Sequence, residues 1–246
     1  MPVMVREASP GLTRMVRRLL AVVSIVVGLT CRAHAHPHMF FDATAHFLID
    51  DQRRLVGIRV AYLIDELNTT FTIAEVTGRQ ITDERAKSRK AEPSDLTPDA
   101  VRAVEANVLD GFAEYVFFAE LVDGSMPVAL LPPSRVAVEL QGGKLGLVMT
   151  LTLTEPLPLA GRALDLRLYD PTYFTEIAIV AAPRLVGSIE GCAVRVYRAA
   201  DTPQSGRLRG LLAQLSREET VTEKNVGILF ADRTRLDCGE LNTDRR

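Results

Sequence analysis

The sequence predicts an α+β protein with a mainly antiparallel sheet and two or three helices. Three observations predict this class. Apolar runs rich in β-branched and aromatic residues recur along the chain, and clusters of Gly, Pro or Asp separate them, as expected for strands joined by turns. Only a few stretches show helical spacing of apolar residues. Strands and helices do not alternate regularly, so no parallel βαβ sheet is expected.

The first 35 residues are predicted to be a secretory signal peptide. A basic segment, 14–18, precedes an apolar run, 19–29, and Ala33-His34-Ala35 has the small-x-small form that signal peptidase cleaves. The apolar run is shorter than the ~20 residues of a transmembrane helix, although an uncleaved N-terminal anchor is the alternative. We therefore expect a periplasmic protein, cleaved after Ala35, with residues 36–246 forming a single domain.

Cleavage would change the charge and the cysteine count of the protein. The full chain of 246 residues has 29 Lys and Arg against 31 Asp and Glu, and the mature chain would have 24 against 30, a net charge of -6. Such an acidic protein is not expected to bind nucleic acid. Cys31 leaves with the signal peptide, so Cys192 and Cys238 are expected to form a disulfide in an oxidising compartment. A metal or redox pair is the alternative, but no C-x-x-C spacing supports it.

Residues 39–49 and 55–64 are predicted to pair as an antiparallel hairpin around the polar turn 50–53. If the turn is centred between Asp51 and Gln52, the numbers of paired residues sum to 103. One face of the hairpin is then almost entirely apolar, and a slip by one residue would expose it. The other face carries polar side chains, namely His38, Asp42, Thr44, His46, Arg59 and Asp65.

The remaining elements follow in order along the chain. A helix is expected over 66–76, then an exposed polar linker at about 77–97, then a helix to about 109 that begins with Thr97 as its cap and Pro98 in its first turn. Strands are expected over 115–122, 135–140, 145–153, 163–168, 176–181, 193–197 and 233–237. Leucines at 208, 211, 212 and 215 lie on one helical face and predict a further short helix.

The predicted mature N-terminus is His36-Pro37-His38, which offers donors for a transition metal. The α-amine and imidazole of His36, together with the imidazole of His38, suit a Zn, Ni or Co ion. Pro37 has no N–H to deprotonate, so further donors from the fold would be needed. In the register above Asp65 lies opposite His38, as a ligand or as the carboxylate that orients the imidazole. A polar terminus without a metal is the alternative.

The segment YDPTYF, residues 169–174, combines an Asp-Pro turn with three aromatic side chains. Packing with one hydrogen bond for each hydroxyl is its ordinary role. The functional alternative is a pocket lined by Asp170 and the hydroxyls of Tyr169 and Tyr173, near the N-terminal histidines. Asp42 and His46 lie too far along the strand to share one ion with His38.

Motifs of the common enzyme classes are absent. The chain contains no G-x-x-x-x-G-K-[ST], G-x-G-x-x-G, G-x-S-x-G or H-E-x-x-H, and both mature cysteines are assigned to the disulfide. We therefore expect neither an enzyme nor a nucleotide cofactor.

Several segments together resemble a known family. They are HPHMFFDA directly after the signal, DDQRRLVGIRVAYLIDEL, EYVFFAEL, YDPTYF, an isolated GC and the closing FADRTRLDC. The family consists of uncharacterised bacterial periplasmic proteins, described as the periplasmic component of an uncharacterised ABC-type transport system and often associated with nickel/cobalt exporter-type membrane proteins.

This resemblance implies a periplasmic accessory or binding protein whose partners are membrane transporter components. The family-type positions that it implies here are His36, His38, Asp42, Asp65, Glu66, Tyr169, Asp170 and Tyr173. Members of the family often carry an acidic stretch like an EF-hand before the second helix. This chain has TGRQITDERAKSRKAEPSD there, without alternating carboxylates, so no calcium is expected. A module that docks on a transporter and binds no metal is the alternative function.

Overall fold

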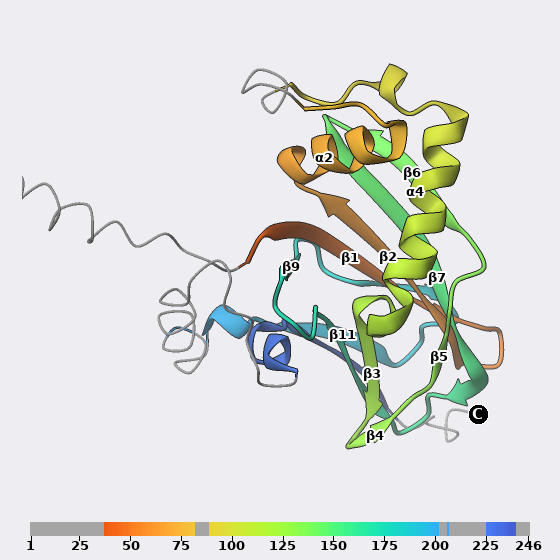
Figure 1. Cartoon of the computed structure of the whole chain (residues 1–246). Helices are drawn as coiled ribbons and strands as arrows, with labels where there is room; N and C mark the ends of the chain where they lie inside the picture. The colour runs from red at the N-terminus through yellow and green to blue at the C-terminus, as the bar shows by residue number, and fades with distance from the viewer. Residues whose placement is uncertain (1–36, 82–88, 202–205, 207–224, 240–246) are drawn as a thin grey trace, which may run out of the picture.

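A long β-hairpin lies at the centre of the fold (Figure 1). The computed structural model describes residues 37–81, 89–201, 206 and 225–239. The hairpin consists of β1 (Met39–Ile49) and β2 (Arg54–Ile64), close to the predicted bounds. The signal peptide, His36 and the predicted helix around Leu208 lie outside the described residues.

The hairpin is extended on both sides into a seven-stranded sheet, here called sheet A. Its strand order is β10-β1-β2-β7-β5, and β6 also pairs with β7 while β9 also pairs with β1. The added strands are β5 (Leu130–Leu131), β6 (Val136–Gln141), β7 (Lys144–Pro158), β9 (Thr175–Ile179) and β10 (Arg184–Gly187). Both β9 and β10 run parallel to β1, the exceptions in an otherwise antiparallel sheet.

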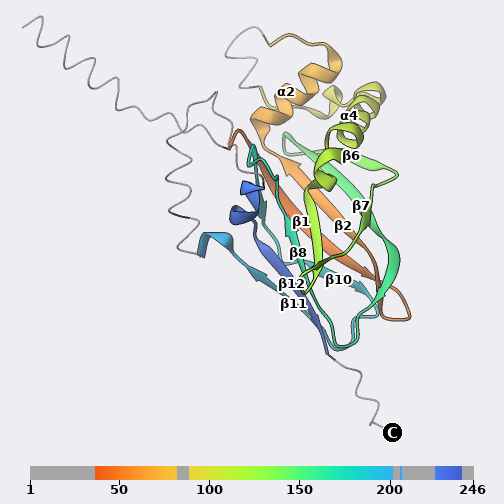
Figure 2. The same ribbon diagram turned by 60° about the horizontal axis from the view of Figure 1, so that its bottom comes forward.

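A second sheet of five strands, sheet B, lies beside sheet A (Figure 2). Its order is β11-β12-β8-β3-β4, and all of its pairs are antiparallel. The strands are β3 (Ala119–Asp123), β4 (Met126–Pro127), β8 (Ala163–Leu168), β11 (Cys192–Tyr197) and β12 (Arg233–Cys238). The predicted α+β class with mainly antiparallel sheet is confirmed.

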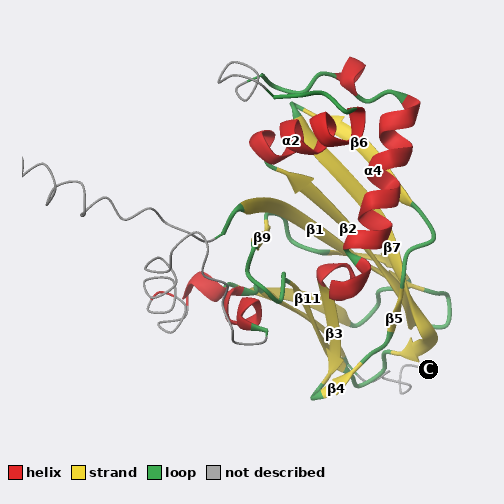
Figure 3. Ribbon diagram, viewed as in Figure 1, coloured by secondary structure: helices red, strands yellow, loops and turns green. Residues whose placement is uncertain are grey.

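Two described α-helices lie at the upper end of sheet A (Figure 3). Helix α2 spans Glu66–Thr77 and helix α4 spans Pro98–Gly111. The cap predicted at Thr97 is confirmed, because its hydroxyl accepts a hydrogen bond from the N–H of Ala100 at 3.2 Å. Short 3₁₀ turns cover Pro93–Asp95, Ala113–Phe118, Ala199–Asp201 and Val226–Phe230. None of the helices among the described residues is long and apolar enough to span a membrane.

The core lies between the inner face of sheet A on one side and α4 with sheet B on the other. Alternate residues of β1 are buried, and the residues of β2 opposite them are buried too. The predicted apolar face is therefore confirmed. Its members include Phe41, Ala43, Ala45, Phe47, Ile49, Ile58, Val60, Tyr62 and Ile64, which pack with Val104, Val108, Leu121, Leu166 and Leu236.

The predicted register of the hairpin is wrong by two residues. Paired numbers sum to 105, as in Phe41 with Ile64 and Ala43 with Tyr62. The turn is a three-residue loop that ends at Arg53, whose φ is +57°, and the register shifts again after Leu48. A shift by two residues preserves which side chains share a face, so the burial pattern was predictable although the pairing was not.

The described flanks of the predicted linker are held together by Asp95. Its carboxylate accepts hydrogen bonds from Arg79 at 3.1 Å and from Arg89 at 3.1 Å, and Ala91 between them is buried. The middle of this segment, 82–88, lies outside the described residues.

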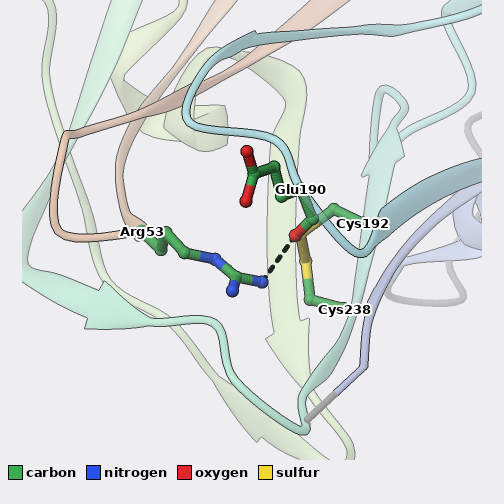
Figure 4. The surroundings of a disulfide bond; sticks show 4 residues. All are labelled: Arg53, Glu190, Cys192 and Cys238. Atoms are coloured by element: carbon green, nitrogen blue, oxygen red, sulfur yellow. Dashed lines mark hydrogen bonds between the residues drawn. A yellow bond between two sulfur atoms is a disulfide. The ribbon is translucent and has the colours of Figure 1, made fainter. Parts of the chain in front are cut away.

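A disulfide joins Cys192 to Cys238, as predicted, at directly paired positions of β11 and β12. The turn of the central hairpin reaches the same place, because Arg53 donates a hydrogen bond to the carbonyl oxygen of Glu190 at 2.5 Å (Figure 4). The N–H of Gly239 also donates to the carbonyl of Gly191 at 3.0 Å. The disulfide and this backbone bond join the ends of β11 and β12 within sheet B, and the Arg53 contact links this end of sheet B to the hairpin of sheet A.

The strand predicted over 115–122 begins only at Ala119. The residues before it form a tight turn in which Val116, Phe117 and Phe118 have φ of +49°, +54° and +60°. Their apolar and aromatic side chains favour a strand, but tertiary contacts override that preference. The buried hydroxyl of Tyr62 donates to the carbonyl of Phe117 at 2.9 Å and thereby holds this left-handed turn in place.

Candidate functional site

The start of β1 lies against the 169–175 segment. The N–H groups of His38 and Met39 both donate to the carbonyl oxygen of Phe174, at 2.8 and 3.2 Å. Met39 then pairs with Thr175 as β9 begins. The imidazole of His38 packs on the ring of Phe174 with 4.8 Å between centroids. The proximity predicted between the N-terminal histidines and YDPTYF is therefore present at His38, whereas His36 lies outside the described residues.

Asp65 does not lie opposite His38, because the observed register places it beside Phe40. It is the N-cap of α2, and its Oδ1 accepts from the N–H of Asn68 at 3.0 Å. Its Oδ2 accepts from the N–H of Phe40 at 3.1 Å and from the side chain of Asn68 at 2.7 Å. Asn68 in turn donates to the carbonyl of His38 at 3.2 Å. Asp65 thus fixes the backbone at His38 through Asn68. Its role as a metal ligand stays a prediction, and ligation would require the carboxylate to give up these hydrogen bonds.

Asp170 organises the 169–175 segment from within. Its side chain accepts hydrogen bonds from the N–H and the hydroxyl of Thr172, at 2.8 and 2.7 Å, and from the N–H of Thr175 at 2.9 Å. Only 4% of the residue is exposed. A buried carboxylate with three donors is well satisfied, so its first role is to shape the loop that begins β9.

The two tyrosines of this segment face the C-terminal part of the chain rather than His38. Tyr173 is buried, and its ring stacks on Phe230 with 4.0 Å between centroids. Burial raises the pKa of the Tyr169 hydroxyl, while a hydrogen bond with the side chain of Asn225 acts in the opposite direction. Gly227 packs so closely on Asp170 that a Cβ there would lie 1.8 Å from the Asp170 carbonyl oxygen. Packing therefore accounts for both tyrosines.

A cavity of about 470 Å³ opens beside Met39 at the start of β1. We call it the aromatic cavity, since its wall is mostly aromatic and apolar. The polar residues in its lining are Tyr115, Asp170, Thr172 and Thr175. Its lining is Met39, Phe41, Gly111, Phe112, Tyr115, Phe118, Asp170, Thr172, Phe174 and Thr175.

A second cavity of about 360 Å³ lies on the other side of the left-handed turn. It shares Tyr115 and Phe118 with the aromatic cavity, and Val116 and Tyr169 also line it. The turn therefore forms the wall between two hollows. Strained backbone of this kind costs about 1–3 kcal/mol for each residue and is concentrated at functional sites, so the turn is a reason to consider ligand binding here.

Asp42 and Glu66, which the family resemblance adds as possible pocket residues, line neither cavity. Asp42 accepts a hydrogen bond from Lys144 at 3.0 Å on the outer face of sheet A. Glu66 accepts one from Lys90 at 2.8 Å at the start of α2. Each carboxylate has a cationic partner of its own. Within the described ranges, no group of three or more His, Cys, Asp or Glu side chains could hold a metal ion.

Sequence analysis missed the wall formed by Phe112, Tyr115 and Phe118. The rings of Phe112 and Phe118 lie 4.6 Å apart, and those of Tyr115 and Phe118 stack at 5.7 Å. The cluster FAEYVFF could have indicated this wall, but its composition is typical of a strand. The segment instead forms a turn that places three of its rings in the lining of the aromatic cavity.

The fold and the site define a class of protein, a disulfide-containing α+β protein of two mostly antiparallel sheets with an aromatic cavity at one end. Within this class the chain belongs to the family described as "Protein of unknown function (DUF1007)", whose profile matches residues 21–238. It is also similar to an uncharacterized protein of Haemophilus influenzae, 21% identical over 206 residues, which are 83% of this chain and 91% of that protein. The expected membership of a family of uncharacterised proteins is thus confirmed.

Proposed function

We propose that the protein is a periplasmic accessory protein of a transport system that binds a transition metal, Zn, Ni or Co, at its mature N-terminus. The observation that carries the proposal is the fixed position of His38. Backbone hydrogen bonds to Phe174 and Asn68 hold both sides of this residue, and its imidazole rests on Phe174. A donor that is already held in place costs less ordering entropy when a metal binds.

The donor chemistry fits these ions. Neutral imidazoles and an amine suit Zn, Ni and Co, and cleavage after Ala35 would supply the amine and one imidazole from His36. Asp65 serves this site as a positioning residue through Asn68. An acidic protein also attracts cations over a longer range.

The test is metal binding by the processed protein, with His36 as the first residue. Isothermal titration with Zn, Ni and Co is expected to show one ion bound for each chain. His38→Ala should weaken binding about tenfold or more, since one ligand is lost. His46→Ala is the matched control, because it removes the same side chain from β1 about 27 Å away and should leave the affinity unchanged.

A retained methionine before His36 should also weaken binding, because it displaces the α-amine. Equal uptake by the wild type and a His36→Ala/His38→Ala variant would contradict the proposal. The transport role is tested separately by deleting the gene and measuring cellular Ni, Co and Zn. Unchanged contents under excess of each metal would reject that part.

The aromatic cavity favours a second candidate, a module that binds a small apolar solute and no metal. Its volume of about 470 Å³ falls in the range of ligand pockets, and its few polar groups lie among aromatic rings. Titration with the fluorescent probe 1-anilinonaphthalene-8-sulfonate tests this candidate. Tyr115→Ala should weaken binding of the probe severalfold, whereas Tyr197→Ala, on β11 and outside the lining, should not. Equal binding by both variants would reject it.

A further inference from the structure

The outer face of sheet A carries three basic side chains in one row across neighbouring strands. His46 of β1 is paired with Arg184 of β10 on one side and with Arg59 of β2 on the other. Paired residues of adjacent strands project from the same face of a sheet. Core residues occupy the opposite face, so this basic row (Arg184, His46 and Arg59) lies on the face directed away from α4 and sheet B.

The row is accessible. Arg59 and Arg184 are exposed and His46 between them is half-buried, whereas Ala45 and Phe47 on either side of it have no exposed surface. Adjacent strands lie about 4.8 Å apart, so the two arginine Cα atoms are separated by about 10 Å, with the imidazole between them. Thr150 of β7, paired with Arg59, extends the row by one hydroxyl.

No acidic side chain compensates the row within the described part of the chain. Neither Arg59 nor Arg184 belongs to an ion pair there, and the strand residues two positions away on this face are uncharged, namely Thr44, Leu48, Gly57, Ala61, Val148, Thr152 and Val186. The nearest carboxylate on the same face of β1 is Asp42, which Lys144 already binds at 3.0 Å. Two further acids lie on this face, Glu176 beside Phe40 at the start of β1 and Glu139 of β6 beside Gly146 of β7, and neither is paired with a residue of the row.

Arg59 and Arg184 flank β1 on either side, and their like charges repel each other weakly across it in the absence of a ligand. Burial, and then the charges of Arg184 and Arg59, lower the pKa of His46. The imidazole is therefore neutral near pH 7 and can donate one hydrogen bond. An oxyanion placed over the row would compensate both guanidinium groups, whose planar forks match phosphate oxygens.

We propose that the basic row of Arg184, His46 and Arg59 binds a phosphate-type oxyanion, either free phosphate or the phosphate of a lipid head group. This site does not depend on the proposed metal site, since His38 and His46 are about 27 Å apart along β1. It also shares no residue with the aromatic cavity.

The experiment titrates the full processed protein with inorganic phosphate at constant ionic strength, and in parallel measures its cosedimentation with phosphatidylglycerol vesicles and phosphatidylcholine vesicles. Arg59→Gln and Arg184→Gln are each expected to weaken binding about tenfold or more, since each removes a charge-assisted contact. Arg102→Gln is the matched control. It removes the same charge from α4, where Arg102 is exposed and paired with Asp99, and should have no effect.

The two arms distinguish the sources of the oxyanion. Arginine-dependent binding of phosphate supports a free ligand, and arginine-dependent binding to phosphatidylglycerol vesicles alone supports a lipid head group. Absence of arginine-dependent binding in both arms would overturn the proposal. An equal loss in Arg102→Gln would overturn it too, because it would indicate only a general effect of net charge.

A proton-linked readout sharpens the test. Because a bound anion favours the charged imidazole, sulfate, which keeps its charge between pH 5 and 8, should raise the pKa of His46 by about one pH unit. The affinity for sulfate should accordingly increase as the pH falls from 7 to 5.5, because His46 becomes charged. NMR of the imidazole protons follows this change, with His38 as the internal control. No change at His46 with sulfate bound would place the anion elsewhere and overturn the assignment.

Discussion

The two ends of β1 are held in opposite ways. Where β1 ends, a hairpin turn stabilised by Asp50 meets the Arg53 contact and the Cys192–Cys238 disulfide (Figure 4). Where β1 starts, it borders the aromatic cavity and a left-handed turn. The end of β1 is thus held by a disulfide and hydrogen bonds, whereas its start lies beside a cavity and a strained turn. The disulfide and polar contacts of the first, closed end should therefore add stability, whereas the left-handed turn at the second, open end costs stability.

The largest expected effect concerns the closed end. Replacing both Cys192 and Cys238 by Ser should lower the free energy of unfolding by about 4 kcal/mol, since the disulfide closes a loop of 46 residues. Urea unfolding of the oxidised protein and the variant measures this change. Reduction of the wild type is the control and should reproduce it. A loss below about 1 kcal/mol would mean that the polar links hold this end without the disulfide.

The second effect concerns the open end. Tyr62→Phe should lower the free energy of unfolding by about 1–3 kcal/mol, because the buried carbonyl of Phe117 loses its hydrogen-bond donor. The same urea experiment applies. Tyr197→Phe, which alters an exposed tyrosine of β11, should change stability by less than about 0.5 kcal/mol. If both substitutions change the stability equally, the hydroxyl of Tyr62 does not stabilise the left-handed turn.

The smallest effect tests the strain itself. Val116→Gly should raise the free energy of unfolding by about 0.5–1 kcal/mol, because relief of a left-handed conformation exceeds the entropic cost of glycine. Val186→Gly in β10 is the matched control, since this exposed strand residue should lose about 1 kcal/mol instead. If both variants lose stability equally, the turn is not strained and the contrast between the two ends is weaker than stated.

Local chemistry made much of the fold predictable. The alternation in β1 gave the buried face, Thr97 with Pro98 gave the start of α4, and the two cysteines remaining after predicted processing gave the disulfide. Each of these depends on neighbouring residues or on a simple count. The proximity of YDPTYF to His38 was predicted only as one of two alternatives. It is present in the structure because β9, which follows YDPTYF, pairs in parallel with β1.

The failures have a common physical cause. The register of the hairpin depended on the left-handed conformation of Arg53, and the role of Asp65 depended in turn on that register. The left-handed turn depended on the hydroxyl of Tyr62, 55 residues before Phe117 in sequence. All three are decided by backbone geometry or by distant contacts, which residue patterns do not encode. The aromatic cavity was missed for the same reason, since its walls come from three separate parts of the chain.

The parallel pairing of β1 has a consequence for the order in which the chain becomes structured. Met39 pairs with Thr175, and Ile49 pairs with Gly187, so one border of the first strand is supplied by residues more than 130 positions later. Contacts this distant close slowly, because a long loop must be ordered before they form. A growing chain therefore cannot complete sheet A until most of its length has been synthesised, and this border of β1 stays without its strand partners until then.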